Sequence, residues 1–358
     1  MHRLEPDVST LYAELIDQLT AADARRSIGQ AAGSFVTKVI KGQEYYYFQH
    51  SAPGGTLKQT YLGRKGSALD ELARRFTVER ADFEADRASI ERLCALLRVG
   101  GAAVTDAGSA RVIAALADSA VFRLGGVLVG THAFIVMNNM LAVRWADGLL
   151  RTDDVDVAGE RVLAIAVPDD KADIPAALES LEMGFLPVPG LSPKEPATSF
   201  KVRGRSLRVD LLTPATGRTK GPVFIPRFGA AAEPLRYLDY LLEDAQHAAV
   251  IDGGGVLVQV PQPARFALHK LLVARSRPAV FQTKADKDLR QAGHLIEVLS
   301  EDRPGDLALA LEALEARGQN WRKTFAEGLA LLAKRASGAA ERVRSIARPK
   351  AKRSQTRR

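Results

Sequence analysis

The chain has 358 residues, of which 46% are apolar and 26% are charged, an ordinary composition for a globular protein with two or three domains. No uncharged apolar run reaches the roughly 18 residues of a membrane span, and the start has no apolar signal-peptide region, so neither a membrane helix nor a signal peptide is expected. The single cysteine, Cys94, excludes an internal disulfide and fits a cytoplasmic location. It lies in an apolar helical pattern, which favours a small buried residue over a reactive thiol.

The formal net charge of +8 is concentrated at the C-terminal end. Residues 333–358 carry ten basic residues and one acidic residue, a net charge of +9, which leaves about −1 for the rest of the chain. A cationic tail attracts polyanions in a salt-dependent way. The alternative is a disordered tail that only aids solubility.

Residues 1–99 are expected to hold a helix, a small β module and a helical linker. A helix is predicted within 4–30, and aromatic and β-branched runs within 34–64 predict an antiparallel sheet whose strands are separated by turn signals at 41–42 and 52–55. Charged residues with helical periodicity over 67–98 predict a long helix.

The β module interleaves basic with aromatic residues: Lys38, Lys41, Lys58, Arg64 and Lys65 with Tyr45, Tyr46, Tyr47, Phe48 and Tyr61. This pattern suits nucleic-acid binding by phosphate pairing and base stacking. The alternative, slightly favoured by the sequence alone, is that the aromatic residues are the only core of a small sheet.

Residues 100–215 are expected to form an α+β core. Its predicted helices are 107–120, 131–141 and 173–184, the last with Asp173 as N-cap, and its predicted strands are 124–129, 154–158, 161–167, 199–202 and 206–212. Residues 216–332 are expected to form a C-terminal helical domain, entered through a linker punctuated by Pro222, Pro226 and Pro234. Its predicted helices are 234–246, 263–276, 284–299 and 306–335, with one strand at 256–260. Residues 333–358 are the predicted disordered basic tail.

The first chemical motif is a strand that ends in Gly130-Thr131 with a helix directly behind it. Glycine lets the backbone approach a phosphate closely. The hydroxyl of Thr131 and the free amides of the helix start offer donors to an anion. Turns of this kind are common, so the motif alone is weak.

The second motif is the stretch Thr152-Asp-Asp-Val-Asp-Val157. On a strand Asp154 and Asp156 share one face while Val155 and Val157 point into the core, and Asp153 faces the opposite way. Two adjacent carboxylates disfavour joint ionisation unless a cation lies between them, and Mg²⁺ prefers such oxygen ligands. The alternative is an exposed polar strand edge.

The third motif is Asp210 within the apolar strand Leu207-Arg-Val-Asp-Leu-Leu212. A buried carboxylate needs a cation, a set of hydrogen bonds or a metal ion. A salt bridge to Arg208 or Arg203, or simple exposure, would also account for it.

In this order the three motifs resemble the nucleotidyltransferase superfamily that shares the DNA polymerase β-like palm. Gly130-Thr131 matches its Gly-Ser with the hydroxyl kept, Asp154-Val-Asp156-Val its paired acidic residues, and Val209-Asp210-Leu its third. Within the superfamily the chain looks most similar to the minimal nucleotidyltransferases of bacteria, including the AbiEii-type toxins, over roughly residues 100–300.

The resemblance implies transfer of a nucleoside monophosphate from an NTP by a two-metal mechanism with Mg²⁺ or Mn²⁺. Asp154 and Asp156 would hold the ion that binds the triphosphate, Asp210 would join them at a second ion, and Gly130 and Thr131 would grip the triphosphate.

The later helices supply further candidates. His269-Lys270 and Lys284 to Gln291 match the family's late Lys and Lys-Asp helix, so Lys270 and Lys287 are expected to contact phosphate and Asp288 to support the site. An equally weighted alternative is that the two lysines lie on a solvated helix face and contact no phosphate. Arg151 stands next to Thr152, whereas the AbiEii pattern spaces its Arg two residues before the Thr, so the resemblance gives Arg151 no role.

The sequence therefore predicts a cytoplasmic, metal-dependent nucleotidyltransferase that is toxin-like and acts on a hydroxyl of RNA or protein. The basic tail and the β module are the expected nucleic-acid contacts. The alternative is a nucleic-acid-binding regulatory protein with a degenerate nucleotidyltransferase fold. No P-loop motif and no histidine spacing typical of a metal site is present in the sequence.

Overall fold

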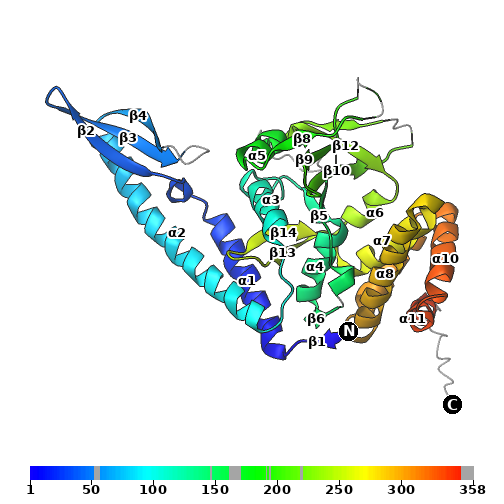
Figure 1. Ribbon diagram of the computed structural model, residues 1–358. Coiled ribbons are helices and arrows are strands. Elements are labelled where there is room, and N and C mark those ends of the chain that lie inside the picture. Colours follow the sequence, from blue (N-terminus) through cyan, green and yellow to red (C-terminus); the bar gives the residue numbers. More distant parts are fainter. Residues whose placement is uncertain are drawn as a thin grey trace, which may run out of the picture.

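The computed structural model describes residues 1–51, 57–145, 147–160, 171–190, 192, 195–217 and 221–347. It is an α+β fold with a mixed central sheet, flanking helices, a small antiparallel β module near the N-terminus and a group of helices at the C-terminus (Figure 1). This is the predicted fold class. The strand predicted at 161–167 lies outside the described residues. Within the described residues, no helix is both long and apolar enough to span a membrane.

The central sheet contains seven strands in the order β11-β12-β10-β7-β5, with β9 pairing with β10 and β8 pairing with β9. Strand β10 runs parallel to β7 on one side, and its other side is shared by antiparallel β9 and parallel β12. The bounds are β5 (Val127–Val129), β7 (Asp154–Ala158), β8 (Phe185–Pro187), β9 (Ser199–Val202), β10 (Arg208–Pro214), β11 (Val223–Ile225) and β12 (Ala230–Leu235).

Short helices and a second hairpin surround this sheet. Asp173 is the N-cap of α5, as predicted, and accepts a hydrogen bond from the Ala176 amide. The elements are α3 (Ala107–Asp118), α4 (Gly130–Met140), α5 (Ile174–Ser180), α6 (Leu238–Leu242), β13 (Gln246–Val250) and β14 (Val256–Val260). A two-stranded pair, β1 (His2–Arg3) with β6 (Val143–Arg144), and 3₁₀ turns at Ile28–Gln30, Asp147–Leu149, Pro226–Phe228 and Ala279–Phe281 complete them.

The C-terminal helices pack on one another and share one continuous hydrophobic core with the sheet. Helix α10 approaches α7 so closely that a Cβ on Gly328 would lie against the Leu271 carbonyl. The helices are α7 (Pro263–Ser276), α8 (Gln282–Asp302), α9 (Pro304–Glu315), α10 (Gln319–Ala333) and α11 (Ser337–Ala347). The single helix predicted over 306–335 is wrong, because the chain breaks at Gly318, whose φ of 103° is not helical.

The segment 216–332, predicted as a helical domain with one strand behind a linker, also contains strands that the sequence does not predict. Strands β11 and β12 extend the central sheet to Leu235, the helix predicted at 234–246 is limited to α6, and β13 begins at Gln246. Pro234 signalled a linker, yet it lies one residue from the end of β12, where the loss of one amide donor is tolerated.

The prediction of disorder from residue 333 is wrong for its first part. Residues 337–347 form helix α11, which buries Ala339, Ala340 and Val343 against the C-terminal helices. The sequence does not reveal this helix, because its many basic residues suggest a solvated tail. Their long side chains can cover the solvent side of a helix while its apolar residues pack on the other side. Residues 348–358 lie outside the described part of the chain.

The N-terminal segment forms an arm (Figure 1). Helix α1 (Pro6–Ala24) packs along the C-terminal part of α2 (Ser67–Val99), and the sheet of β2 (Ser34–Ile40), β3 (Gln43–Ser51) and β4 (Leu57–Arg64) lies at the other end of α2. The predicted antiparallel sheet and long helix are confirmed. The arm is anchored by a separate apolar cluster that includes Ala249 of β13, where the Tyr12 hydroxyl donates to the Ala249 carbonyl over 3.0 Å.

Cys94 lies in this cluster and is fully buried, as predicted, and burial raises the pKa of its thiol to about 11. We expect the folded chain to react with a disulfide reagent at pH 8 at least about a hundredfold more slowly than the chain in guanidinium, because both access and thiolate are suppressed. The rate of colour release from Ellman's reagent measures this difference in the reactivity of the thiol. Release of one equivalent within seconds from the native protein would contradict the buried placement.

Candidate active site

The turn between β5 and α4 requires glycine. Residues 127–129 are buried, and Gly130 follows with a φ of 66°, a left-handed conformation that favours glycine. A Cβ at this position would collide with the carboxylate oxygen Oδ2 of Asp156. Gly130 therefore gives room to that carboxylate and opens helix α4, whose second residue is Thr131.

Strict alternation in β7 and β10 directs the acidic residues to one face. Val155 and Val157 are buried on the core side of β7, which leaves Asp154 and Asp156 on the other side. In β10 Val209 and Leu211 are buried and Asp210 alternates with them. This is the arrangement that the sequence predicts from a two-residue period.

The strand register then brings the motifs together. Asp210 lies directly opposite Asp156 in the parallel β10–β7 pair, and Asp156 lies opposite Val129 in the antiparallel β7–β5 pair. Three adjacent strands thus place Val129, Asp156 and Asp210 in one row, and Gly130 follows Val129 directly.

Burial and the two neighbouring carboxylates both act on the pKa of Asp156. Burial, followed by the negative charges of Asp210 and Asp154, raises the pKa of Asp156 to about 7. A carboxyl group in this position gains from any cation that lies beside it.

Asp210 has two neighbours of its own. Its Oδ1 accepts a hydrogen bond from the Ser199 hydroxyl of β9 and forms an ion pair with Arg208 Nε over 2.6 Å. Arg208 also donates to Ser199 over 2.8 Å. The salt bridge to Arg208, which the sequence offers as an alternative, is therefore present. Asp210 nevertheless lies beside Asp156.

The three aspartates line a cavity of about 300 Å³, a size that suits a small ligand. All eight residues that the sequence singles out as catalytic or ligand-binding line it: Gly130, Thr131, Asp154, Asp156, Asp210, Lys270, Lys287 and Asp288. Lys284, Arg277 and Thr152 also line it. One wall is acidic and comes from the sheet, and the opposite wall is basic and comes from α7, the turn after it and α8.

Asp288 organises the basic wall. It is almost fully buried and accepts from Lys270 over 2.6 Å and from Arg277 over 2.7 Å. Burial alone would raise its pKa, but these two cations outweigh burial and hold the pKa of Asp288 below its usual value. Asp288 is therefore ionised and fixes two cations at the rim of the cavity.

Lys287 is held differently. Its Nζ donates to the Arg151 carbonyl over 2.7 Å, which ties α8 to the segment before β7. Burial and the neighbouring charge of Lys270 lower the pKa of Lys287. Both lysines face the same cavity, whereas the sequence left a solvated helix face as an equal alternative.

Three neighbouring residues line a second cavity, of about 770 Å³, instead: Arg151, Asp153 and His132. Asp153 faces away from Asp154 and Asp156, as its strand position predicts. His132 is buried, and burial lowers its pKa to about 4, so its imidazole is neutral near pH 7.

Sequence reasoning missed Arg277, Ser199 and the apolar lining from α6. Arg277 follows the end of α7 and carries no motif, and Ser199 reaches the site only through the pairing of β9 with β10. The ion pair of Arg208 could have been found, because residues two apart on a strand share a face.

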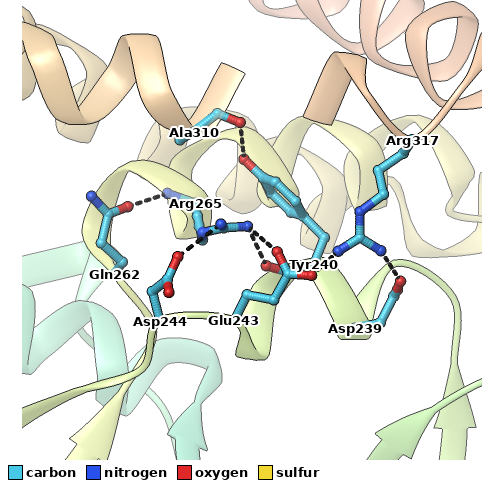
Figure 2. A network of polar contacts seen from close by, with 8 residues as sticks. All are labelled: Asp239, Tyr240, Glu243, Asp244, Gln262, Arg265, Ala310 and Arg317. Atoms are coloured by element: carbon cyan, nitrogen blue, oxygen red, sulfur yellow. Dashed lines mark hydrogen bonds and ion pairs between the residues drawn. The ribbon is translucent and has the colours of Figure 1, made fainter. Parts of the chain in front are cut away.

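A polar network fixes α6 and α7, which flank the cavity (Figure 2). Arg265 at the start of α7 is almost buried and pairs with Glu243 over 2.7 Å and Asp244 over 2.8 Å. The Tyr240 hydroxyl donates to the Ala310 carbonyl of α9 over 2.8 Å, and Arg317 pairs with Asp239 and Glu243. The network holds the helix that carries Lys270 against the end of the sheet.

The donor set fits a divalent cation by its chemistry. Asp154, Asp156 and Asp210 supply hard oxygen ligands on neighbouring strands, and a cation would offset both the burial and the neighbouring negative charges that raise the pKa of Asp156. Within the described ranges, however, no three acidic, histidine or cysteine side chains are already arranged around one ion position.

Comparison with known proteins shows that a family model described as nucleotidyltransferase matches residues 107–315. Among solved structures, an antigenic nucleotidyltransferase-like protein from Paracoccidioides brasiliensis is 17% identical, with a TM-score of 0.29, over 60% of this chain and 91% of that one. No curated protein sequence matches the chain.

The raised pKa of Asp156 predicts that this carboxylate lowers stability when ionised. A folded pKa of about 7 exceeds the unfolded value, so the contribution of Asp156 to stability falls as pH rises from about 4 to 7. In chelator at pH 8, Asp156→Asn should raise the free energy of unfolding by on the order of 2 kcal/mol, and the gain should vanish near pH 4. Urea unfolding at both pH values measures it. A destabilised Asp156→Asn variant at pH 8 would contradict the geometry.

Gly130 provides a second test with a matched control. Gly204 has a similar φ of 74° but open space around its Cβ position, so Gly204→Ala should cost only the backbone strain, about 1 kcal/mol. Gly130→Ala should cost more, because the new methyl group must displace Asp156. Equal losses in a denaturation experiment would show that the carboxylate does not lie against Gly130.

Proposed function

We propose that this chain, which belongs to the nucleotidyltransferase family, moves a nucleoside monophosphate from an NTP to an acceptor hydroxyl and releases pyrophosphate. The observation that supports this most is that Asp156 and Asp210 lie side by side on paired strands, next to Gly130, and face a basic wall. In the proposed reaction the acceptor oxygen bonds to the α-phosphorus, the bond to the bridging oxygen of pyrophosphate breaks, and the hydroxyl proton leaves to solvent.

The triphosphate would bind between the start of α4 and the basic wall. The free amides at the start of α4 and the Thr131 hydroxyl can donate to phosphate oxygens. Lys270 and Lys287 can neutralise the leaving pyrophosphate, and Asp288 acts as a positioning residue because it holds Lys270 and Arg277.

Asp154, Asp156 and Asp210 would hold divalent cations, Mg²⁺ or Mn²⁺, as the resemblance to two-metal enzymes implies. Bound there, such ions stabilise charge on the phosphoryl oxygens and on the attacking hydroxyl. The protein's own part is positioning: β7 and β10 fix the carboxylates, and Arg208 balances Asp210.

The acceptor is proposed to be a hydroxyl of RNA or of a protein, and a toxin-like role related to the AbiEii group is part of the same proposal. A cytoplasmic location fits the single buried thiol of Cys94. The alternative, a regulatory nucleic-acid-binding protein with a degenerate active site, is supported by the basic and aromatic residues of the arm and by the basic residues of 333–358.

Transfer of label from α-³²P-labelled NTPs to cellular RNA or protein in the presence of Mg²⁺ tests the function. Asp154→Asn and Asp156→Asn should each reduce transfer by roughly a thousandfold or more, because both carboxylates act on the reacting phosphate. Asp153→Asn is the matched control, since it removes the same charge one residue away from the cavity face. It should retain activity within about threefold.

A second readout does not depend on turnover. Mg²⁺ should raise the melting temperature of the wild type and of Asp153→Asn but not of Asp156→Asn, because binding to the folded state alone stabilises it. Absence of both label transfer and the Mg²⁺ effect in the wild type, with RNA binding intact, would favour the regulatory alternative.

A further inference from the structure

The three-stranded sheet of the arm has two chemically different faces. Cross-strand pairing places Tyr46, Phe48 and Glu44 of β3 on one face and Tyr45 and Tyr47 on the other, since neighbours alternate along a strand. A bulge between Tyr46 and Tyr47 shifts the register of β4, so that Tyr61 lies opposite Tyr47 and Arg64 opposite Tyr45.

The first face is the core of the module. Phe35 and Phe48 pack on Phe76 of α2, with ring centroids 5.2 Å and 5.7 Å away. The Tyr46 hydroxyl donates to Asp70 of α2 over 2.8 Å. The reading of the aromatic residues as a small core therefore holds for this face only.

The second face, which we call the tyrosine face, is defined by Lys38, Tyr45, Tyr47, Tyr61 and Arg64. Tyr61 is 57% exposed, and its ring contacts the rings of Tyr45 and Tyr47 at centroid distances of 6.0 Å and 5.5 Å. The Lys38 ammonium lies 4.8 Å from the centroid of the Tyr47 ring. The face thus presents a row of aromatic rings with basic groups beside them.

Negative charge in strands β2–β4 is confined to the face toward α2. Glu44 is the only acidic residue in strands β2–β4, and it lies on the α2 side, paired with Lys65 over 3.0 Å. The tyrosine face therefore carries positive charge without a carboxylate, which is complementary to a polyanion.

We propose that the tyrosine face binds single-stranded RNA by stacking unpaired bases on its tyrosines while Lys38 and Arg64 pair with phosphates. This rests on the proposed function, because it names RNA as the acceptor. Exposed aromatic rings flanked by cations bind single strands with little sequence preference, since every base has a stacking face.

The position of the module favours a polymer over a small acceptor. Helix α2 has 33 residues and is therefore about 50 Å long, and the module lies at the end away from the core (Figure 1). A small acceptor bound there could not reach Asp156, whereas an RNA strand can occupy the arm and still present a hydroxyl at the cavity.

Fluorescence anisotropy with labelled RNA of about 20 nucleotides, as single strand and as duplex, tests the proposal on the full chain without NTP. Tyr61→Ala should weaken single-strand binding roughly tenfold, and Tyr47→Ala with Tyr61→Ala more strongly. Tyr61→Phe, which keeps the ring, should bind within about twofold of wild type. The duplex should bind more weakly than the single strand, because its bases are already stacked.

Lys38 and Lys58 give a charge-matched pair on opposite faces of the sheet. Lys38→Ala should reduce the slope of log affinity against log salt by about 0.7, the value for one phosphate contact on a single strand. Lys58→Ala should change the slope less. The basic tail is identical in all variants, so binding that Tyr61→Ala, Tyr47→Ala and Lys38→Ala leave unchanged would overturn the proposal and assign RNA binding to another surface.

Two further outcomes separate this inference from the proposed function. Asp156→Asn should bind RNA as the wild type does while losing transfer. Label transfer to RNA that the tyrosine variants do not affect would overturn the tyrosine face alone. A concentration-dependent dimer that Tyr61→Ala dissolves, without RNA binding, would assign the face to a second copy of the chain and overturn the RNA proposal.

Discussion

The register between β7 and β10 forces two carboxylates into contact range, and the rest of the site responds to that constraint. Asp156 and Asp210 lie opposite each other on parallel strands, where joint ionisation is unfavourable. Gly130 gives Asp156 space that any side chain would occupy, and Arg208 compensates the charge of Asp210. A fold that served stability alone would favour an apolar residue in place of Asp156, so the buried carboxylate is consistent with the proposed role in holding a cation.

On the basic wall the repulsion is between positive charges, because several cations lie close together beside the cavity. Asp288 solves part of it by holding Lys270 and Arg277 from a buried position, and removing it would leave two cations without a partner. The wall must also stay at a fixed distance from the sheet. Arg265 contributes here, since its pairs with Glu243 and Asp244 join the start of α7 to the end of α6 (Figure 2).

The sequence predicts the parts of the site that follow from local periodicity. Alternation in β7 and β10 places Asp154, Asp156 and Asp210 on one face, and a glycine between a strand and a helix marks the turn. It does not predict what depends on pairing between distant segments, such as Ser199 beside Asp210. The fold shows the same division: long periodic helices were predicted, whereas β11, β12 and β13 were missed because short strands rely on their neighbours more than on their own pattern.

The aromatic residues of the arm illustrate why sequence reasoning alone could not decide between core and surface. Both interpretations use the same residues, and only the register separates them: Phe48 packs on Phe76, and its neighbour Tyr47 faces the other way. The bulge after Tyr46 matters most, because in an unbroken register Leu62 would pair with Tyr47 and Tyr61 would lie on the face toward α2. The arm can hold the β module in a defined position only if the base of the arm is rigid. The buried hydrogen bond of Tyr12 to β13, together with the apolar cluster around it, supplies that rigidity where the arm joins the body that carries the active site.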